Sequence, residues 1–94
     1  MNKIFDQIII RDVEFRNRLW VSPMCQYSSI DGMPTDWHLV HLGSRAVGGA
    51  GLVIVEATAI SKEGRISPDD SGIWSDAHGE AFGRLIRFIK QQGS

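Results

Sequence analysis

The loop sequence SPMCQYSS, residues 22–29, contains the only cysteine and the only tyrosine of the chain, Cys25 and Tyr27. It directly follows the apolar run at residues 19–21, which is typical of a β-strand. A thiol is a weak hydrogen-bond donor and, as thiolate, a soft nucleophile, and a phenol both donates and accepts hydrogen bonds. The local sequence leaves two interpretations open: a ligand-binding loop, or a small buried thiol beside a packed tyrosine.

Glu56 is the second candidate, because it ends the otherwise apolar run of residues 52–55. A carboxylate in such a place must reach a hydrogen-bond donor or a positive partner, since burying it unpaired is costly. The sequence leaves open a catalytic base or a structural anchor tied to an arginine or to backbone amides. We favour the anchor.

The histidines and the glycine-rich stretch are weaker candidates. His38 and His41 are three residues apart, but zinc needs about three protein ligands, so we predict a solvated or loop-packing pair and no metal site. His78 is expected to lie in the first turn of a helix. The glycines of GGAG, residues 48–51, leave a helix and enter a strand, which predicts a tight turn and not a phosphate-binding loop.

The elements that position the first loop are read from residue patterns. We predict a hairpin from residues 8–10 and 13–15, reversing at Arg11-Asp12, and then a strand at 19–21. Thr35 is expected to cap a helix that begins at Asp36. Helical periodicity predicts a buried arc of Leu39, Val40, Leu42, Gly43, Ala46 and Val47, with His38, His41 and Arg45 on the opposite side.

A second strand and helix follow. LVIVEA, residues 52–57, is apolar without alternation, which predicts a strand covered on both faces, as in a parallel sheet. A long loop from Thr58 to about Trp74 leads to a helix that Ser75 caps and Gly93 closes after Gln92. The predicted buried stripe of this helix is Ala81, Phe82, Leu85, Ile86, Phe88 and Ile89.

The order of elements predicts the α/β class. Both long loops follow the carboxyl ends of parallel strands, which is the edge where α/β folds bind ligands. Two strands and two helices leave sheet edges open, and a (β/α)8 barrel, the TIM barrel, needs about 250 residues. We therefore expect residues 1–94 to form the opening part of one barrel domain, which is incomplete.

Composition excludes several classes of partner. With 10 basic and 11 acidic residues the net charge is −1, which gives no electrostatic footprint for nucleic acid or an anionic membrane. No apolar run is long enough for a membrane span, and no signal-peptide core follows Met1, so we expect a cytoplasmic protein. A single cysteine cannot form an intrachain disulfide.

Several blocks together resemble a known family. NRLWVSPMCQYSS, then H-x-x-H-x-x-SRA-x-G-x-x-GLVIVEATA, then EGRIS and GIWSD, resemble the amino-terminal quarter of Old Yellow Enzyme family proteins. The resemblance runs from about Phe5 to Ser94, and is best to the bacterial branch with a cysteine in its first βα loop. Members of that branch are FMN-dependent NAD(P)H dehydrogenases, also called ene-reductases or xenobiotic reductases.

The resemblance implies a TIM barrel, of which this chain covers an N-terminal β-hairpin and the first two β/α units. FMN is expected at the carboxyl face, with cofactor contacts at Ser22, Pro23, Met24, Cys25 and Ala57. The cysteine would tune the flavin's redox behaviour as a weak donor. The methyl of Ala57 would leave room for the ring, and Tyr27 would reach the substrate pocket.

The implied reaction passes a hydride from NADPH or NADH to FMN and then to a small activated alkene. The resemblance implies a homo-oligomeric parent protein and no catalytic residue that we can assign here. The family's remaining groups for the FMN phosphate and the substrate carbonyl would follow Ser94. We therefore expect the 94 residues alone to bind FMN weakly or not at all, without turnover.

Two alternatives belong to other classes. The chain is alternatively a non-catalytic folding or assembly unit that associates through open strand edges and exposed apolar helix faces. A weaker alternative is another TIM-barrel enzyme that uses Glu56 as its base.

Overall fold

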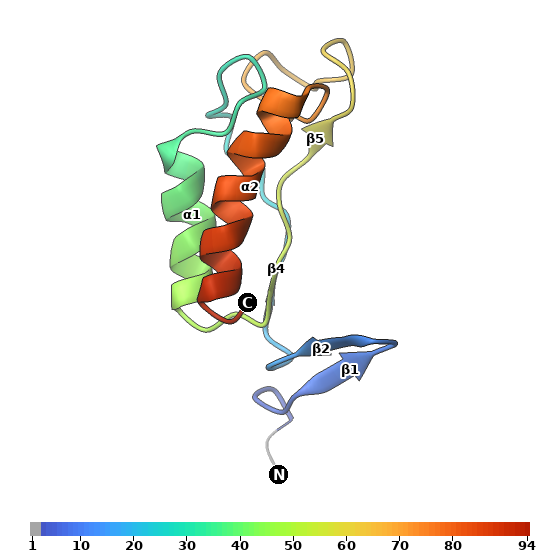
Figure 1. The fold of residues 1–94 in the computed structure, drawn as a ribbon, viewed down its shortest axis with the longest axis vertical. Helices are drawn as coiled ribbons and strands as arrows, with labels where there is room; N and C mark the ends of the chain where they lie inside the picture. Colours follow the sequence, from blue (N-terminus) through green and yellow to red (C-terminus); the bar gives the residue numbers. More distant parts are fainter. Residues whose placement is uncertain (1–2) are drawn as a thin grey trace.

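The computed structural model describes residues 3–94, and its amino-terminal part is the expected hairpin (Figure 1). Strand β1, Ile8–Ile10, pairs antiparallel with β2, Val13–Phe15, and Ile9 lies opposite Glu14. Arg11 at the reversal has a φ of 55°, in the left-handed region that tight hairpin turns use. The predicted bounds of both strands are confirmed.

The next two strands are parallel neighbours, as the strand–helix–strand order predicts. Strand β3, Trp20–Val21, pairs with β4, Leu52–Val53, with Trp20 opposite Leu52. Both strands are shorter than the predicted 19–21 and 52–57, although Ile54 N–H still donates to the Val21 carbonyl oxygen at 3.1 Å. Their carboxyl ends point to the same edge.

The prediction that the second strand has both faces covered is wrong for this chain. Val53 and Val55 pack against the helices, whereas Ile54 points the other way and is 42% exposed. Helices therefore cover one face of this strand only, and the apolar composition that suggested two covered faces is not satisfied within residues 3–94.

The long second loop contains a parallel pair of strands that the sequence did not predict. Strand β5, Thr58–Ala59, pairs with β6, Ser71–Gly72. Each has only two residues, and a cluster of glycine, proline and aspartate between them masks any strand pattern. The three sheets of residues 3–94 are thus two-stranded, small and open.

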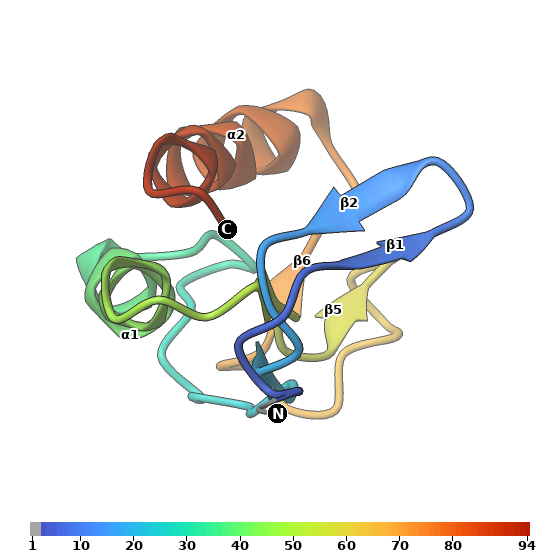
Figure 2. The ribbon, with the colours of Figure 1, turned by 90° about the horizontal axis from the view of Figure 1, so that it is seen from below.

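The two helices lie side by side on one side of the strands (Figure 2). Helix α1 spans Asp36–Val47 and α2 spans Asp76–Gln91, close to the predicted limits. Their shared core is Leu42, Phe82 and Leu85. Gly43 permits the close approach, because a Cβ there would lie 2.9 Å from the Phe88 ring.

The predicted helix faces need correction. Val40 and Val47 of α1 are exposed, as is Ile86 of α2, whereas His38 and His41 are buried at 1% and 6% exposure. The periodicity placed both histidines on the solvent side. His38 is buried because residues of the loops after β3 and β4 cover it, whereas His41 stacks on Trp37 of the same helix.

A single side chain gathers the carboxyl ends of both helices. The Arg16 guanidinium donates to the carbonyl oxygens of Ala46 at 2.9 Å, Ala50 at 3.0 Å and Gln92 at 2.6 Å. The second acceptor, Ala50, belongs to the predicted tight turn of GGAG, residues 48–51, in which Gly49 has a φ of 109°. Cations are favourable at helix carboxyl ends, so Arg16 stabilises both.

Candidate functional site

The loop that follows β3 is largely open to solvent. Ser22, Pro23 and Met24 are exposed, Cys25 is half-buried, and Tyr27 is 55% exposed. The core of the chain therefore seals neither the thiol nor the phenol. Ala57, which follows β4, is exposed as well.

One contact joins the two segments that the sequence nominates. The Gln26 backbone N–H donates to Oε2 of Glu56 at 3.3 Å. Gln26 adjoins Cys25, and Glu56 adjoins Ala57, so this bond brings two regions about thirty residues apart together beyond the end of the β3–β4 ladder. The predicted cofactor contacts thus lie on neighbouring segments at one sheet edge.

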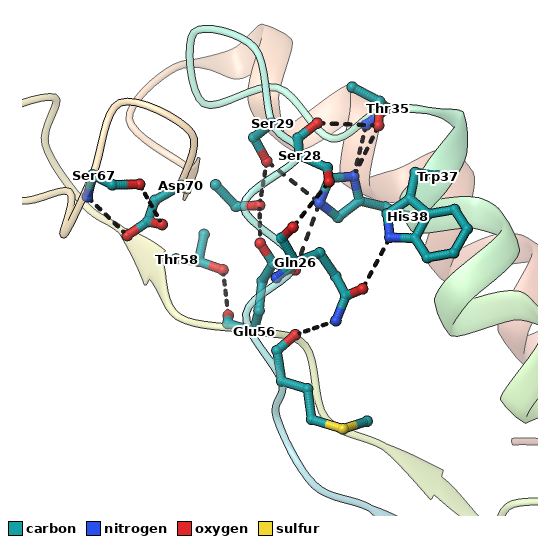
Figure 3. Close-up of polar contacts among 12 residues, drawn as sticks. Gln26, Ser28, Ser29, Thr35, Trp37, His38, Glu56, Thr58, Ser67 and Asp70 are labelled. Atoms are coloured by element: carbon teal, nitrogen blue, oxygen red, sulfur yellow. Dashed lines mark hydrogen bonds and ion pairs between the residues drawn. The ribbon is translucent and has the colours of Figure 1, made fainter.

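Glu56 belongs to a buried polar cluster, which we define as Ser29, His38, Glu56 and Ser71 (Figure 3). Ser71 donates its hydroxyl proton to Oε1 of Glu56 at 3.1 Å, and the Ser29 and Ser71 Oγ atoms are 2.7 Å apart. His38 Nε2 lies 3.4 Å from Ser29 Oγ and 3.5 Å from Glu56 Oε2.

The contacts of His38 fix its tautomer. The Thr35 backbone N–H donates to Nδ1 at 2.9 Å, so Nδ1 presents a lone pair and the ring proton sits on Nε2. Nε2–H then donates toward Ser29, Ser29 donates to Ser71, and Ser71 donates to Glu56. Each donor in the buried polar cluster has an acceptor, which is the condition for burying such groups at low cost.

Glu56 has the contacts of a structural anchor. Both of its carboxylate oxygens accept hydrogen bonds, and the residue is 7% exposed. A general base needs a free lone pair within reach of a substrate proton. The interpretation of Glu56 as an anchor, which we favoured from sequence, agrees with this geometry, although the predicted partners did not include a serine hydroxyl.

Neither His38 nor His41 is solvated, so that part of the prediction is wrong, while packing against loops is confirmed for His38. His41 stacks on the Trp37 ring with centroids 6.4 Å apart. Burial lowers the pKa of His41, and the nearby Arg45 charge lowers it further while Glu56 opposes both. Within residues 3–94, no group of histidine, cysteine and carboxylate side chains is arranged to hold a metal ion.

Gln26 itself was missed by the sequence argument. Its side-chain Nε2 donates to the Met24 carbonyl oxygen at 2.9 Å, and its Oε1 accepts from Trp37 Nε1 at 2.9 Å (Figure 3). Gln26 lies between Cys25 and Tyr27, but a polar residue is common in a loop and gave little reason to single it out. His38 had a stronger signal, because it occupies the third helical position, whose side chain often reaches back to the cap.

His78 joins the first long loop to the second. Its Nε2 lies 2.9 Å from the Asp31 carbonyl oxygen and must donate to it, so Nδ1 accepts from the Ser75 hydroxyl at 2.6 Å. The ring also packs on Trp74 with centroids 4.3 Å apart. The expected first-turn position is confirmed, but the residue is buried and ties both loops together.

Residues 22–25 and Ala57 form an open strip at the carboxyl edge of β3 and β4. The strip presents a half-buried thiol, which is a weak hydrogen-bond donor, beside the exposed residues Ser22, Pro23 and Met24. Ala57 also borders a small hollow with Thr58, Ala59, Gly64, Arg65, Ile66 and Asp70.

No helix within residues 3–94 combines the length and the apolar composition that a membrane crossing requires.

A family model described as "NADH:flavin oxidoreductase / NADH oxidase family" matches residues 3–94. An NADPH dehydrogenase of Bacillus subtilis (strain 168) is 50% identical over 94 residues, covering 98% of this chain and 28% of the relative. The chain thus spans under a third of that relative's length.

Solved structures show the same arrangement of elements. The Old Yellow Enzyme homologue from Zymomonas mobilis superposes with a TM-score of 0.87 at 35% identity, covering 99% of this chain and 26% of that one. A morphinone reductase in complex with tetrahydroNAD gives a TM-score of 0.89 at 26% identity, covering 100% of this chain and 25% of that one. The fold described above therefore corresponds to a part of those larger proteins.

Proposed function

The chain belongs to the NADH:flavin oxidoreductase / NADH oxidase family, and from this premise we propose that it forms one wall of an FMN site. The resemblance to the Old Yellow Enzyme family inferred from sequence is confirmed. In the whole protein, the proposed activity is that of an NAD(P)H dehydrogenase acting on a small activated alkene. We propose that this chain supplies the hairpin and first two β/α units of a (β/α)8 barrel.

The observation that carries the proposal is the bond between the Gln26 N–H and Glu56. It supports a single cofactor-facing strip made of Ser22, Pro23, Met24 and Cys25 on one side and Ala57 on the other. FMN, when bound, would accept a hydride from NADPH or NADH and deliver it to the substrate.

The chain's own residues have separable roles in this proposal. The backbone and side chains of Ser22, Pro23 and Met24 line the ring, the Cys25 thiol donates a weak hydrogen bond to it, and Ala57 leaves space for it. Tyr27, exposed on the same loop, donates from its phenol to the substrate. Glu56 holds the strip together and takes no proton from the substrate.

A chimera tests this proposal directly. Residues 1–94 replace the matching segment of the Bacillus subtilis NADPH dehydrogenase, and purified protein is assayed for bound FMN and for NADPH oxidation with cyclohexenone. We expect one FMN per chain and turnover. Ala57→Phe is expected to abolish FMN binding, whereas Ala77→Phe, at an exposed position of α2, serves as a control for added bulk.

The 94-residue chain alone is expected to bind FMN weakly or not at all in a fluorescence-quenching titration. A folded chimera without FMN would overturn the proposal. Tight one-to-one FMN binding by the Ala57→Phe chimera would overturn it as well.

An assembly role is the second candidate, and exposed apolar residues favour it. Ile9, Ile10 and Val13 on the hairpin are each about half exposed or more, and β3 and β4 have unpaired outer edges. Light scattering after size exclusion discriminates the two: a compact monomer of the 94-residue chain counts against assembly, and a defined oligomer favours it.

A further inference from the structure

Gln26 separates the residue proposed to face the cofactor from the residue proposed to face the substrate. Three parts of the chain converge on it: Glu56 from the segment after β4 accepts its backbone N–H, Trp37 from the first turn of α1 donates to its side chain, and the Met24 carbonyl oxygen accepts from that side chain. The loop is thus held from a strand and from a helix at one residue.

The backbone next to Gln26 is strained. Tyr27 has a φ of 51°, which is unfavourable for a bulky aromatic residue and costs on the order of 1 kcal/mol or more. Such a conformation persists only where neighbouring bonds determine it. The Ser28 hydroxyl donates to the Gln26 carbonyl oxygen at 2.9 Å, and the Ser29 N–H donates to the Asp69 carbonyl oxygen at 3.0 Å.

These bonds lie on both sides of Tyr27, so its exposed phenol extends from a backbone that is fixed before and after it. Because the Tyr27 side chain is 55% exposed, packing of the ring offsets little of the strain in its backbone. Strain of this kind concentrates at ligand-binding positions.

We propose that Gln26 is a positioning residue: with Glu56 and Trp37 it fixes the Cys25 thiol and the Tyr27 phenol relative to each other, so that one addresses the cofactor and the other the substrate. We call the contacts of Gln26 with Glu56 and Trp37 the clamp. The clamp rests on these contacts, whereas the assignment of Cys25 to the cofactor end and of Tyr27 to the substrate end rests on the function proposed above.

The clamp is tested in the 94-residue chain by alkylation of its single cysteine with iodoacetamide, followed by mass spectrometry. Gln26→Met keeps the side-chain volume and removes both side-chain bonds, and we expect Cys25 to react about fivefold faster. Trp37→Phe keeps an aromatic ring at position 37, removes the indole donor together with part of the ring, and is expected to give a smaller increase.

The double variant distinguishes positioning from general destabilisation. Because Trp37 acts through Gln26, Gln26→Met combined with Trp37→Phe should react no faster than Gln26→Met alone, whereas independent losses of stability would add. Gln91→Met, on the exposed side of α2, is the matched control and should leave the rate unchanged. Near-ultraviolet circular dichroism tests whether each variant is folded. If Gln26→Met is unfolded, the alkylation rate of Trp37→Phe decides whether the clamp exists.

The cofactor and substrate ends are tested in the chimera with the Bacillus subtilis relative. Gln26→Met should keep one FMN per chain, shift the flavin absorption spectrum, and raise the KM for cyclohexenone about fivefold, relative to the Gln91→Met chimera. Alkylation rates equal to wild type in Gln26→Met and Trp37→Phe overturn the clamp alone. A wild-type chimera that folds without FMN overturns the proposed function, and with it the roles assigned to the two ends.

Discussion

The chain has two interiors of opposite character. Between the helices, Leu42, Phe82 and Leu85 form an apolar core, whereas at the carboxyl edge of the strands Ser29, His38, Glu56 and Ser71 form the buried polar cluster. The apolar core stabilises the fold by removing apolar surface from water. Each hydrogen bond of the buried polar cluster adds little net stability, but breaking one is costly, because the partner left behind stays buried and unsatisfied.

The apolar core and the buried polar cluster have different roles. An apolar core tolerates many shapes of similar volume, and specifies position poorly. A cluster of directional bonds permits few arrangements, and here it fixes the segment next to the Cys25–Tyr27 loop. Stability is therefore expected to depend mainly on the helix interface, and the geometry of the candidate site mainly on the polar cluster.

The largest effect should come from the apolar interior. Leu85→Ala removes a side chain that is 3% exposed and is expected to lower the free energy of unfolding by about 3 kcal/mol. Ile86→Ala, one position further along α2 and 43% exposed, should cost less than about 1 kcal/mol. Urea unfolding measures both. Equal costs would mean that the helix interface does not carry the stability.

Breaking the buried polar cluster should rank second. Glu56→Ala leaves the Gln26 N–H and the Ser71 hydroxyl without an acceptor, and should cost about 2 kcal/mol. Glu56→Gln retains one acceptor oxygen and should cost less. Glu80→Gln, on the exposed side of α2, should change the urea midpoint negligibly. If Glu56→Ala unfolds at the wild-type midpoint, the carboxylate is not an anchor.

A cap outside both interiors should have a smaller effect. The Ser75 hydroxyl accepts from the His78 N–H at the start of α2, and Ser75→Ala should cost about 1 kcal/mol. Ser44→Ala in the last turn of α1 removes a hydroxyl that donates to the His41 carbonyl oxygen, one turn back, and accepts from the exposed Arg45 side chain; it should be neutral or slightly stabilising. Thermal unfolding of the two variants compares them, and the order reversed would contradict the cap.

The smallest effect concerns pH, at the boundary between the two interiors. Burial, then Arg45, lowers the pKa of His41 below its ordinary value of 6.5, so the unfolded chain binds the proton more readily. This contribution to stability is present above pH 6.5 and is lost as pH falls toward the folded-state pKa. His38 and Arg45 on α1, and Glu56 opposite, are the groups that face it.

The melting temperature of wild type should therefore fall between about pH 8 and about pH 5.5 by more than that of His41→Gln. A His41→Gln variant with the same pH dependence as wild type would show that another group is responsible.

The apolar interior could be predicted from sequence because it obeys a period. The spacing of Phe82 and Leu85 on α2, and the caps Thr35 and Ser75, fixed the helices to within a residue. The pairing of β3 with β4 followed from strand order. The same periodicity misplaced Val40, because its solvent side is not covered within residues 3–94.

The buried polar cluster could not be predicted, because its bonds join residues with no common spacing. Ser29 and Ser71 are 42 residues apart, and neither belongs to a periodic segment. The sequence left His38 as either solvated or packed against a loop, because a helical period describes only one partner surface; in the structure it packs against loop residues. Residue type and loop position singled out Cys25 and Tyr27, whereas motif resemblance gave them roles and added Ser22, Pro23, Met24 and Ala57. Neither argument identified a residue that holds them in place.

Arg16 also has a consequence for how the polypeptide is made. Its guanidinium bonds to the Ala46 and Ala50 carbonyls once those residues are synthesised, but its third acceptor, Gln92, is 76 residues away in sequence. Because synthesis proceeds from the amino end, one donor of this arginine stays hydrated until residue 92 has been added. A nascent chain that stops before residue 92 would therefore lack the contact that fastens the carboxyl end of its second helix to Arg16.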